Sequence, residues 1–428
     1  MQGIRAAMLA VLLAGPVQAQ EFTTLKGHGG PIMGIAVAPD GRVATASFDN
    51  SVGLWQGRDP TWLDGHAAAV TALIFTAGGA VISASDDFTV RRWGAGEVIG
   101  RHQGKVQALA LSPDGAWLAS GSWDGTVRLW SLGPLGPLAT GAPRELAKPG
   151  AGVNALAFAP DGTLYAGTTA GDLLRYDLTG DTPIPLVRHG FGVNEIVAGP
   201  GWLAYGAVDG VTRVIDPETG DQIADFTLDR RPILSMAWHP GTAQLAVGDG
   251  QGFIMIVDTN TWAIARDYRA TREGPVWALA FSPDGTTIYA GGLDDAAYGW
   301  PVALLDAFDP AMGQERTFLR DADTMDNGER QFMRKCSICH ALDAGPSRKA
   351  GPTLHGLFGR RAGTVPGYGY SPILDGSDII WGEDTIDALF DIGPDHYIPG
   401  SKMPMQVIAG DADRADLIAF LRDATTKE

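Results

Sequence analysis

Short apolar segments with a two-residue period recur along the chain up to Trp300. Val106-Gln107-Ala108-Leu109 and Val127-Arg128-Leu129-Trp130 are examples, and each is bounded by Gly or Asp. This alternation is typical of β-strands that bury one face. Between such segments lie turns such as Pro39-Asp40-Gly41 and Pro113-Asp114-Gly115, whose residues stand in the order that a tight turn favours. The pattern therefore predicts many short strands joined by tight turns.

The predicted strands fall into repeats of about 40 residues. Three repeats end in similar segments, which are SFDNSVGLW at Trp55, SDDFTVRRW at Trp93 and SWDGTVRLW at Trp130. Seven units of this length predict the blades of a β-propeller, in which radial repetition leaves only short, protected sheet edges. The other four units end at Asp177, Asp216, Asp258 and Trp300.

The repeats resemble those of the WD-repeat β-propeller family over residues 20–303. In that family an Asp six residues before the Trp closes a tight turn, and a His that opens the unit joins the same polar network. The resemblance also implies that Phe22 to Leu25 completes the last blade and closes the ring. Here the Asp position holds Asp49, Asp87, Asp124 and Asp294, and the His position holds His28, His66, His102 and His189.

The strand periodicity stops near Ala303, and residues 304–324 are predicted to be a linker. Beyond it the apolar positions follow the 3.6-residue period of helices. Helices are predicted from Asp326 or Asn327 through Phe332, from Glu383 to Ile392 and from Asp413 to Asp423. We therefore expect a multi-domain chain, in which an all-β seven-bladed propeller precedes an all-α domain at residues 325–428.

The first 19 residues have the layout of an export signal. Arg5 supplies the positive start, Ala6 to Gly15 the apolar stretch, and Val17-Gln18-Ala19 a small-residue cleavage site. The apolar stretch is about half of the roughly 20 residues that a membrane-spanning helix needs. We expect cleavage, a soluble periplasmic protein and no membrane span in the mature chain, with retention of the signal as an anchor as the alternative.

The net charge of −17 argues against a nucleic-acid-binding protein, because phosphate backbones are bound by clustered Lys and Arg. The chain has 2 cysteines, Cys336 and Cys339, and His340 follows directly. A C-x-x-C-H run is a heme attachment motif, since two thiols on one turn can meet the two vinyl groups and the next residue brings an imidazole beneath the iron. The alternatives are a chance match and a redox-active cysteine pair.

The surroundings of this motif resemble the small class I cytochromes c over roughly residues 326–426. The resemblance rests on Gly328 and Phe332 before the motif, on GPTLHGLFGR at Gly351 to Arg360, and on YIPGSKM at Tyr397 to Met403. It implies one heme c, attached through Cys336 and Cys339, with His340 and Met403 as the axial ligands of the iron. Met405 is the alternative to Met403.

The same resemblance implies how other residues surround the heme. The Pro352 carbonyl would accept a hydrogen bond from the His340 imidazole, which fixes the ring and tunes its basicity. Tyr370, Trp381 and Ser401 would donate to the propionates, and Arg360 would lie near them. One departure from the family is that the helix position often occupied by a Tyr, which bonds the Met sulfur, falls here on Leu389 or Phe390.

Two axial ligands leave the iron no open position, so the chain is expected to be an electron carrier without catalytic residues. The propeller would then be a docking platform for redox partner proteins of an electron-transfer chain. One alternative is a periplasmic oxidoreductase, in which the propeller holds a second active site and the cytochrome domain relays electrons. Another is a scaffold whose heme stabilises or senses.

Overall fold

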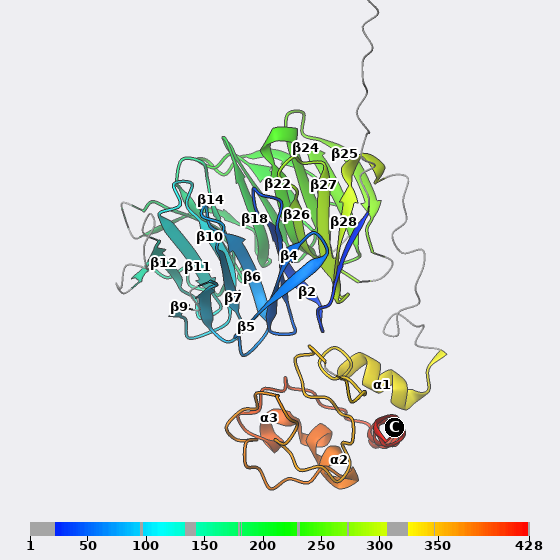
Figure 1. The fold of residues 1–428 in the computed structure, drawn as a ribbon. Helices are drawn as coiled ribbons and strands as arrows, with labels where there is room; N and C mark the ends of the chain where they lie inside the picture. The colour runs from blue at the N-terminus through cyan, green and yellow to red at the C-terminus, as the bar shows by residue number, and fades with distance from the viewer. Residues whose placement is uncertain are drawn as a thin grey trace, which may run out of the picture.

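The computed structural model describes residues 22–94, 97–132, 143–178, 180, 182–228, 232–271, 274–305, 324–345 and 347–426. The predicted export signal and residues 306–323 of the predicted linker lie outside this part. Seven four-stranded sheets form a propeller, and a helical domain follows it in the sequence (Figure 1). The predicted order of a seven-bladed propeller and a helical domain is therefore confirmed.

Each of the first six blades consists of four consecutive strands that pair as antiparallel neighbours. The first strand of each blade packs against the first strand of the next, and β26 packs against β2, which closes the ring. Blades one to three are formed by β2 (Ile32–Val37), β3 (Val43–Ser47), β4 (Ser51–Gln56), β5 (Asp59–Asp64), β6 (Val70–Phe75), β7 (Val81–Ser85), β8 (Thr89–Arg92), β9 (Glu97–Arg101), β10 (Val106–Leu111), β11 (Trp117–Ser122), β12 (Val127–Ser131) and β13 (Arg144–Glu145).

Blades four to six have the same plan, although they lack the Trp that lies within one residue of the end of the third strand in the first three blades. They are formed by β14 (Val153–Phe158), β15 (Leu164–Thr168), β16 (Asp172–Tyr176), β17 (Pro183–Arg188), β18 (Val193–Gly199), β19 (Trp202–Ala207), β20 (Thr212–Ile215), β21 (Gln222–Asp225), β22 (Ile233–His239), β23 (Gln244–Asp249), β24 (Phe253–Asp258) and β25 (Ala263–Arg269), with the 3-10 turn η1 (Pro240–Thr242) after β22.

The seventh blade joins the two ends of the propeller. It contains β26 (Val276–Phe281), β27 (Thr287–Gly292) and β28 (Ala296–Pro301), and β1 (Thr23–Lys26) is its outermost strand. Thr23 lies opposite Gly299, and Lys26 lies opposite Ala296. The predicted closure of the ring by the first strand is therefore confirmed, and a second short turn, η2 (Val302–Leu304), follows.

A buried polar network repeats in the first blades. In blade one, His28 Nδ1 lies 2.9 Å from the Asp49 carboxylate and His28 Nε2 lies 2.7 Å from the Thr45 hydroxyl, to which the Trp55 indole also donates. Burial alone would raise the pKa of Asp49, but hydrogen bonds from His28 and Ser51 outweigh it and lower that pKa. The network satisfies polar groups whose burial would otherwise be costly.

The equivalent network in blade five has an aspartate that the sequence analysis did not identify. His189 Nε2 lies 3.0 Å from Asp209, which therefore takes the place that Asp49 has in blade one. In blade seven, Asp294 accepts a hydrogen bond from the Tyr298 hydroxyl. In blades one and five, the predicted histidine thus lies beside an aspartate in the turn between the second and third strands. Asp209 is an addition to the predicted aspartates.

The C-terminal domain contains four helices, which are α1 (Asn327–Lys335), α2 (Glu383–Ile392), α3 (Pro394–Tyr397) and α4 (Asp411–Thr425). α1 packs against α4, where the rings of Phe332 and Phe420 lie 5.5 Å apart. A Cβ on Gly328 would lie 2.2 Å from the Asp416 carbonyl oxygen, so this crossing requires a glycine. None of the helices in the described part of the chain has both the length and the apolar composition to cross a membrane.

Candidate functional site

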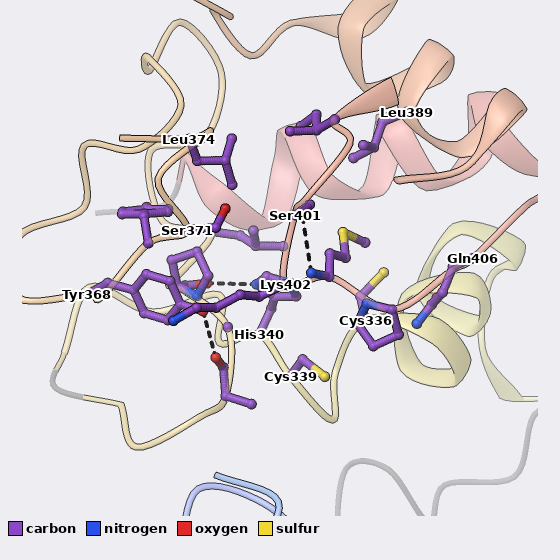
Figure 2. A pocket seen from close by; sticks show the side chains of 18 of the residues that line it. Cys336, Cys339, His340, Tyr368, Ser371, Leu374, Leu389, Ser401, Lys402 and Gln406 are labelled. Carbon is purple, nitrogen blue, oxygen red and sulfur yellow. Dashed lines mark hydrogen bonds between the residues drawn. The ribbon is translucent and has the colours of Figure 1, made fainter. Parts of the chain in front are cut away.

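The nine residues predicted for the site line a single cavity of about 640 Å³. Figure 2 labels Cys336, Cys339, His340 and Ser401 among the side chains that line it. The nine come from distant parts of the C-terminal domain, and the loops between its helices supply most of them. The nine residues are Cys336, Cys339, His340, Pro352, Arg360, Tyr370, Trp381, Ser401 and Met403.

The end of α1 positions both thiols and the imidazole. Cys336 caps the helix through its backbone N–H, which donates to the Phe332 carbonyl, and the backbone N–H of both Cys339 and His340 donates to the Cys336 carbonyl. One tight turn therefore presents all three side chains to the cavity. Burial raises the pKa of the Cys336 thiol to about 12.

His340 has its proton fixed on one ring nitrogen. Its Nδ1–H donates to the Pro352 carbonyl over 2.7 Å. Burial lowers the pKa of the imidazole, so the neutral ring is favoured. Because Nδ1 carries the proton, Nε2 keeps the lone pair with which histidine binds a metal ion.

The two candidate thioethers lie in different surroundings. Met403 lines the cavity and packs against the core of the domain. Met405 is 51 % exposed, is not among the cavity-lining residues, and has its sulfur next to Gly393. Met403 is therefore the methionine that can reach a group bound in the cavity.

The polar atoms of the cavity include one that sequence reasoning missed. The Ser371 hydroxyl is buried, lines the cavity and has no hydrogen-bond partner among the described residues. Arg360 donates to the Thr353 carbonyl, and the Tyr370 hydroxyl accepts from the Val365 N–H. The signal that could have revealed Ser371 is its place directly after Tyr370, one of the predicted propionate donors.

The two positions considered for the Tyr of the family are both buried hydrocarbon side chains that line the cavity, Leu389 and Phe390. With Leu357, Ile386 and Ile398 they form an apolar wall. A cavity with two thiols, an imidazole, a thioether, an unpartnered hydroxyl and apolar walls fits a heme, whose ring is apolar and whose propionates are polar.

Part of the cavity wall comes from the propeller. Loops of the first three blades contribute it, and the sequence analysis did not anticipate this contact. Arg348, in the loop after His340, also lies on blade one, where it pairs with Asp64. The propeller residues that line the cavity are Phe48, Asn50, Ala67, Ala68, Ala69, Asp86, Phe88 and Lys105.

Comparison with known protein families agrees with both domains. The model of the WD domain, G-beta repeat, matches residues 19–56, 59–94, 97–131 and 265–300. The cytochrome c model matches residues 325–425. The matched repeats belong to blades one, two, three and seven, so blades four to six are assigned by the structure.

Plant cytochromes c are similar to the C-terminal domain. The chain is 48 % identical over 100 residues to cytochrome c of Sesamum indicum, which covers 23 % of this chain and 88 % of that protein. Cytochrome c of Gossypium barbadense is 46 % identical over 99 residues, with 23 % and 87 % covered. Through its C-terminal domain the chain therefore belongs to the cytochrome c family, and that domain follows a seven-bladed WD-repeat propeller.

Proposed function

We propose that the chain is an exported electron carrier with one heme c. Cys336 and Cys339 form the thioether bonds, and His340 and Met403 are the axial ligands of the iron. One observation carries this proposal. Two thiols, an imidazole and a thioether line the same cavity, although residues 336 and 403 are 67 positions apart in the sequence. The bound heme supplies a reversible one-electron change at its iron.

The protein's part is to hold the heme and to keep water away from it. Pro352 fixes the orientation of the His340 ring through the 2.7 Å hydrogen bond, which is the kind of contact that tunes a metal-binding histidine. Arg360, Tyr370, Trp381, Ser401 and Ser371 are the residues proposed to surround the propionates. With both axial positions filled, electron transfer needs no acid or base from the protein.

The propeller serves as a docking platform for a redox partner protein. Trp123 in blade three, and Phe191 and Val208 in blade five, are 50 %, 57 % and 47 % exposed. We call these three side chains, which blade four separates into two groups, the apolar strip. Lys105 joins this strip to the heme cavity, because its side chain lines the cavity and its Nζ lies 5.4 Å from the centroid of the Trp123 ring. A partner bound on the apolar strip would therefore be held beside the heme.

Export follows from the sequence, since residues 1–19 have the layout of a cleavable signal. We place the mature protein in the periplasm, where covalent attachment would prevent loss of the heme. The two cysteines of the chain are both used for that attachment.

The test follows the heme spectrum of the purified full-length protein during incubation with membranes and a respiratory substrate. The expected result is repeated reduction and oxidation of the heme, with no small molecule consumed by the protein alone. A heme that stays in one oxidation state, together with a small molecule turned over by the full-length protein, would favour the oxidoreductase instead.

A further inference from the structure

The loop after the heme-binding motif attaches the cytochrome domain to the propeller. Arg348 pairs with the Asp64 carboxylate at the end of β5, and its guanidinium lies over the Trp62 ring, with Cζ 4.2 Å from the ring centroid. These interactions combine charge complementarity with a cation–π contact. One arginine therefore bridges two residues of the outer strand of blade one.

The backbones of the two domains also approach closely at this place. A Cβ on Gly29 would lie 2.2 Å from the carbonyl carbon of Arg348 and 2.4 Å from the backbone nitrogen of Lys349. Each of its three nearest neighbours belongs to the cytochrome domain. Gly29 thus permits the close contact between the domains.

A second cation faces the propeller beside Arg348. The Lys349 side chain donates to the Ser337 carbonyl, inside the heme-binding motif, over 2.6 Å. Burial lowers the pKa of Lys349, and the negative charge of Asp295, in the turn between β27 and β28, opposes this effect. Asp64 of blade one thus lies near Arg348, and Asp295 of blade seven lies near Lys349 in the same loop.

The heme cavity opens toward the propeller at the same interface. Phe48, Phe88 and the Ala67–Ala69 segment form an apolar wall there. From the cytochrome side, Cys339, Lys402 and Gln406 line the same cavity. The side of the heme next to Cys339 is therefore bordered by the propeller and not by solvent alone.

We infer that this face of the propeller is a docking surface for the heme edge of the chain's own cytochrome domain. The surface consists of Gly29, Phe48, Trp62, Asp64, Phe88 and Asp295. Because Phe48 and Phe88 of this surface line the heme cavity together with Cys339, a bulky protein must displace the surface to reach the heme from that side. The apolar strip on later blades remains available to a partner. This inference rests on the proposed electron-carrier function.

The test uses the full-length holoprotein with ferrous heme and two oxidants, ferricyanide as the small one and a soluble blue-copper protein as the bulky one. Gly29→Ala adds one methyl group at the contact and changes no charge. Its oxidation by the blue-copper protein should be faster by roughly five-fold or more, whereas its oxidation by ferricyanide should change by less than about two-fold. Gly78→Ala is the matched control, because a Cβ there meets only the Thr76 hydroxyl, at 3.9 Å.

A second set of variants, which exchanges the charges of Arg348 and Asp64, tests the inference even if Gly29→Ala does not fold. Arg348→Asp and Asp64→Arg should each speed oxidation by the blue-copper protein, and the double variant should return toward the wild-type rate. Wild-type rates in Gly29→Ala and in both single variants would overturn the docking surface alone. A heme that ferricyanide does not oxidise would overturn the proposed function as well.

Discussion

The guanidinium of Arg348 in the cytochrome domain lies over the indole of Trp62 in the first blade, with Cζ 4.2 Å from the ring centroid. Trp62 is itself held in place by Trp55 and His28, whose ring centroids lie 5.6 and 4.8 Å away. The ring that Arg348 contacts therefore packs directly against His28, which belongs to the buried polar network of blade one. The fold of the propeller and the position of the heme are linked through this stack.

Removal of this arginine should loosen the domains without unfolding either one. An exposed ion pair and a cation–π contact contribute about 1 kcal/mol each. In Arg348→Ala we expect a larger radius of gyration in small-angle X-ray scattering and a free energy of unfolding within about 0.5 kcal/mol of wild type for each domain. Arg361→Ala is the control, because Arg361 pairs with Asp378 inside the cytochrome domain. An unchanged radius in Arg348→Ala would contradict the role of the arginine.

Met403 and Met405 should differ in their effect on the iron. The ferric holoprotein should show the weak far-red band of a sulfur-to-iron bond. Met403→Ala should abolish that band and lower the reduction potential, since an axial thioether raises it. Met405→Ala should keep the band, because Met405 is half exposed and does not line the cavity. The opposite result would assign the ligand to Met405.

The effect of Ser371→Ala on stability tests whether the Ser371 hydroxyl bonds a heme propionate, because the two possibilities predict changes of opposite sign. A buried hydroxyl without a partner costs free energy, whereas a hydrogen bond to a charged propionate contributes about 1.5 to 3 kcal/mol. We expect Ser371→Ala to lower the free energy of unfolding of the holoprotein in urea by about that amount. An increase in stability would show that the hydroxyl has no partner in the holoprotein either.

His102 should make the propeller sensitive to mild acid. Burial lowers the pKa of His102 to about 4, and its Nδ1 bonds Thr126 at 2.9 Å while Asp124 lies 3.4 Å away. The folded state therefore favours the neutral ring. Its contribution to stability is complete above the unfolded pKa of 6.5 and is lost as the pH falls through the folded value.

Between pH 7 and pH 4.5 the wild-type propeller should lose up to about 2.5 kcal/mol through this histidine. Urea unfolding, followed by the circular dichroism of the strands at both pH values, measures the loss. His102→Gln should flatten the pH dependence. Equal slopes in His102→Gln and wild type would show that His102 is not the group that titrates.

The sequence was most informative where local chemistry repeats. A Trp within one residue of the end of the third strand marks the units of blades one to three, and its spacing identifies Asp49 and its equivalents. Blade five has no such Trp, and the position six residues before the predicted end of its unit at Asp216 is Gly210, so this spacing does not identify Asp209. The 20 residues from His189 to Asp209, close to the 21 from His28 to Asp49, could have revealed it.

Other features depend on contacts that no local pattern contains. α3 has four residues, which is too short for a helical period to be visible. The pair of Arg348 and Asp64 is separated by 284 positions in the sequence, and neither residue belongs to a motif. For this reason the sequence does not predict that the propeller forms part of the wall of the heme cavity. It does predict the cytochrome residues that line this cavity.

The proposed function depends first on one heme bound covalently through Cys336 and Cys339. The most direct measurement is the intact mass of the exported protein after acid–acetone extraction, with a variant that carries Ser at both cysteine positions beside it. We expect the mass of the chain from residue 20 plus a single heme, and heme-free protein for the variant. Heme released into the organic phase from the wild-type protein, or a mass without heme, would contradict the proposed function.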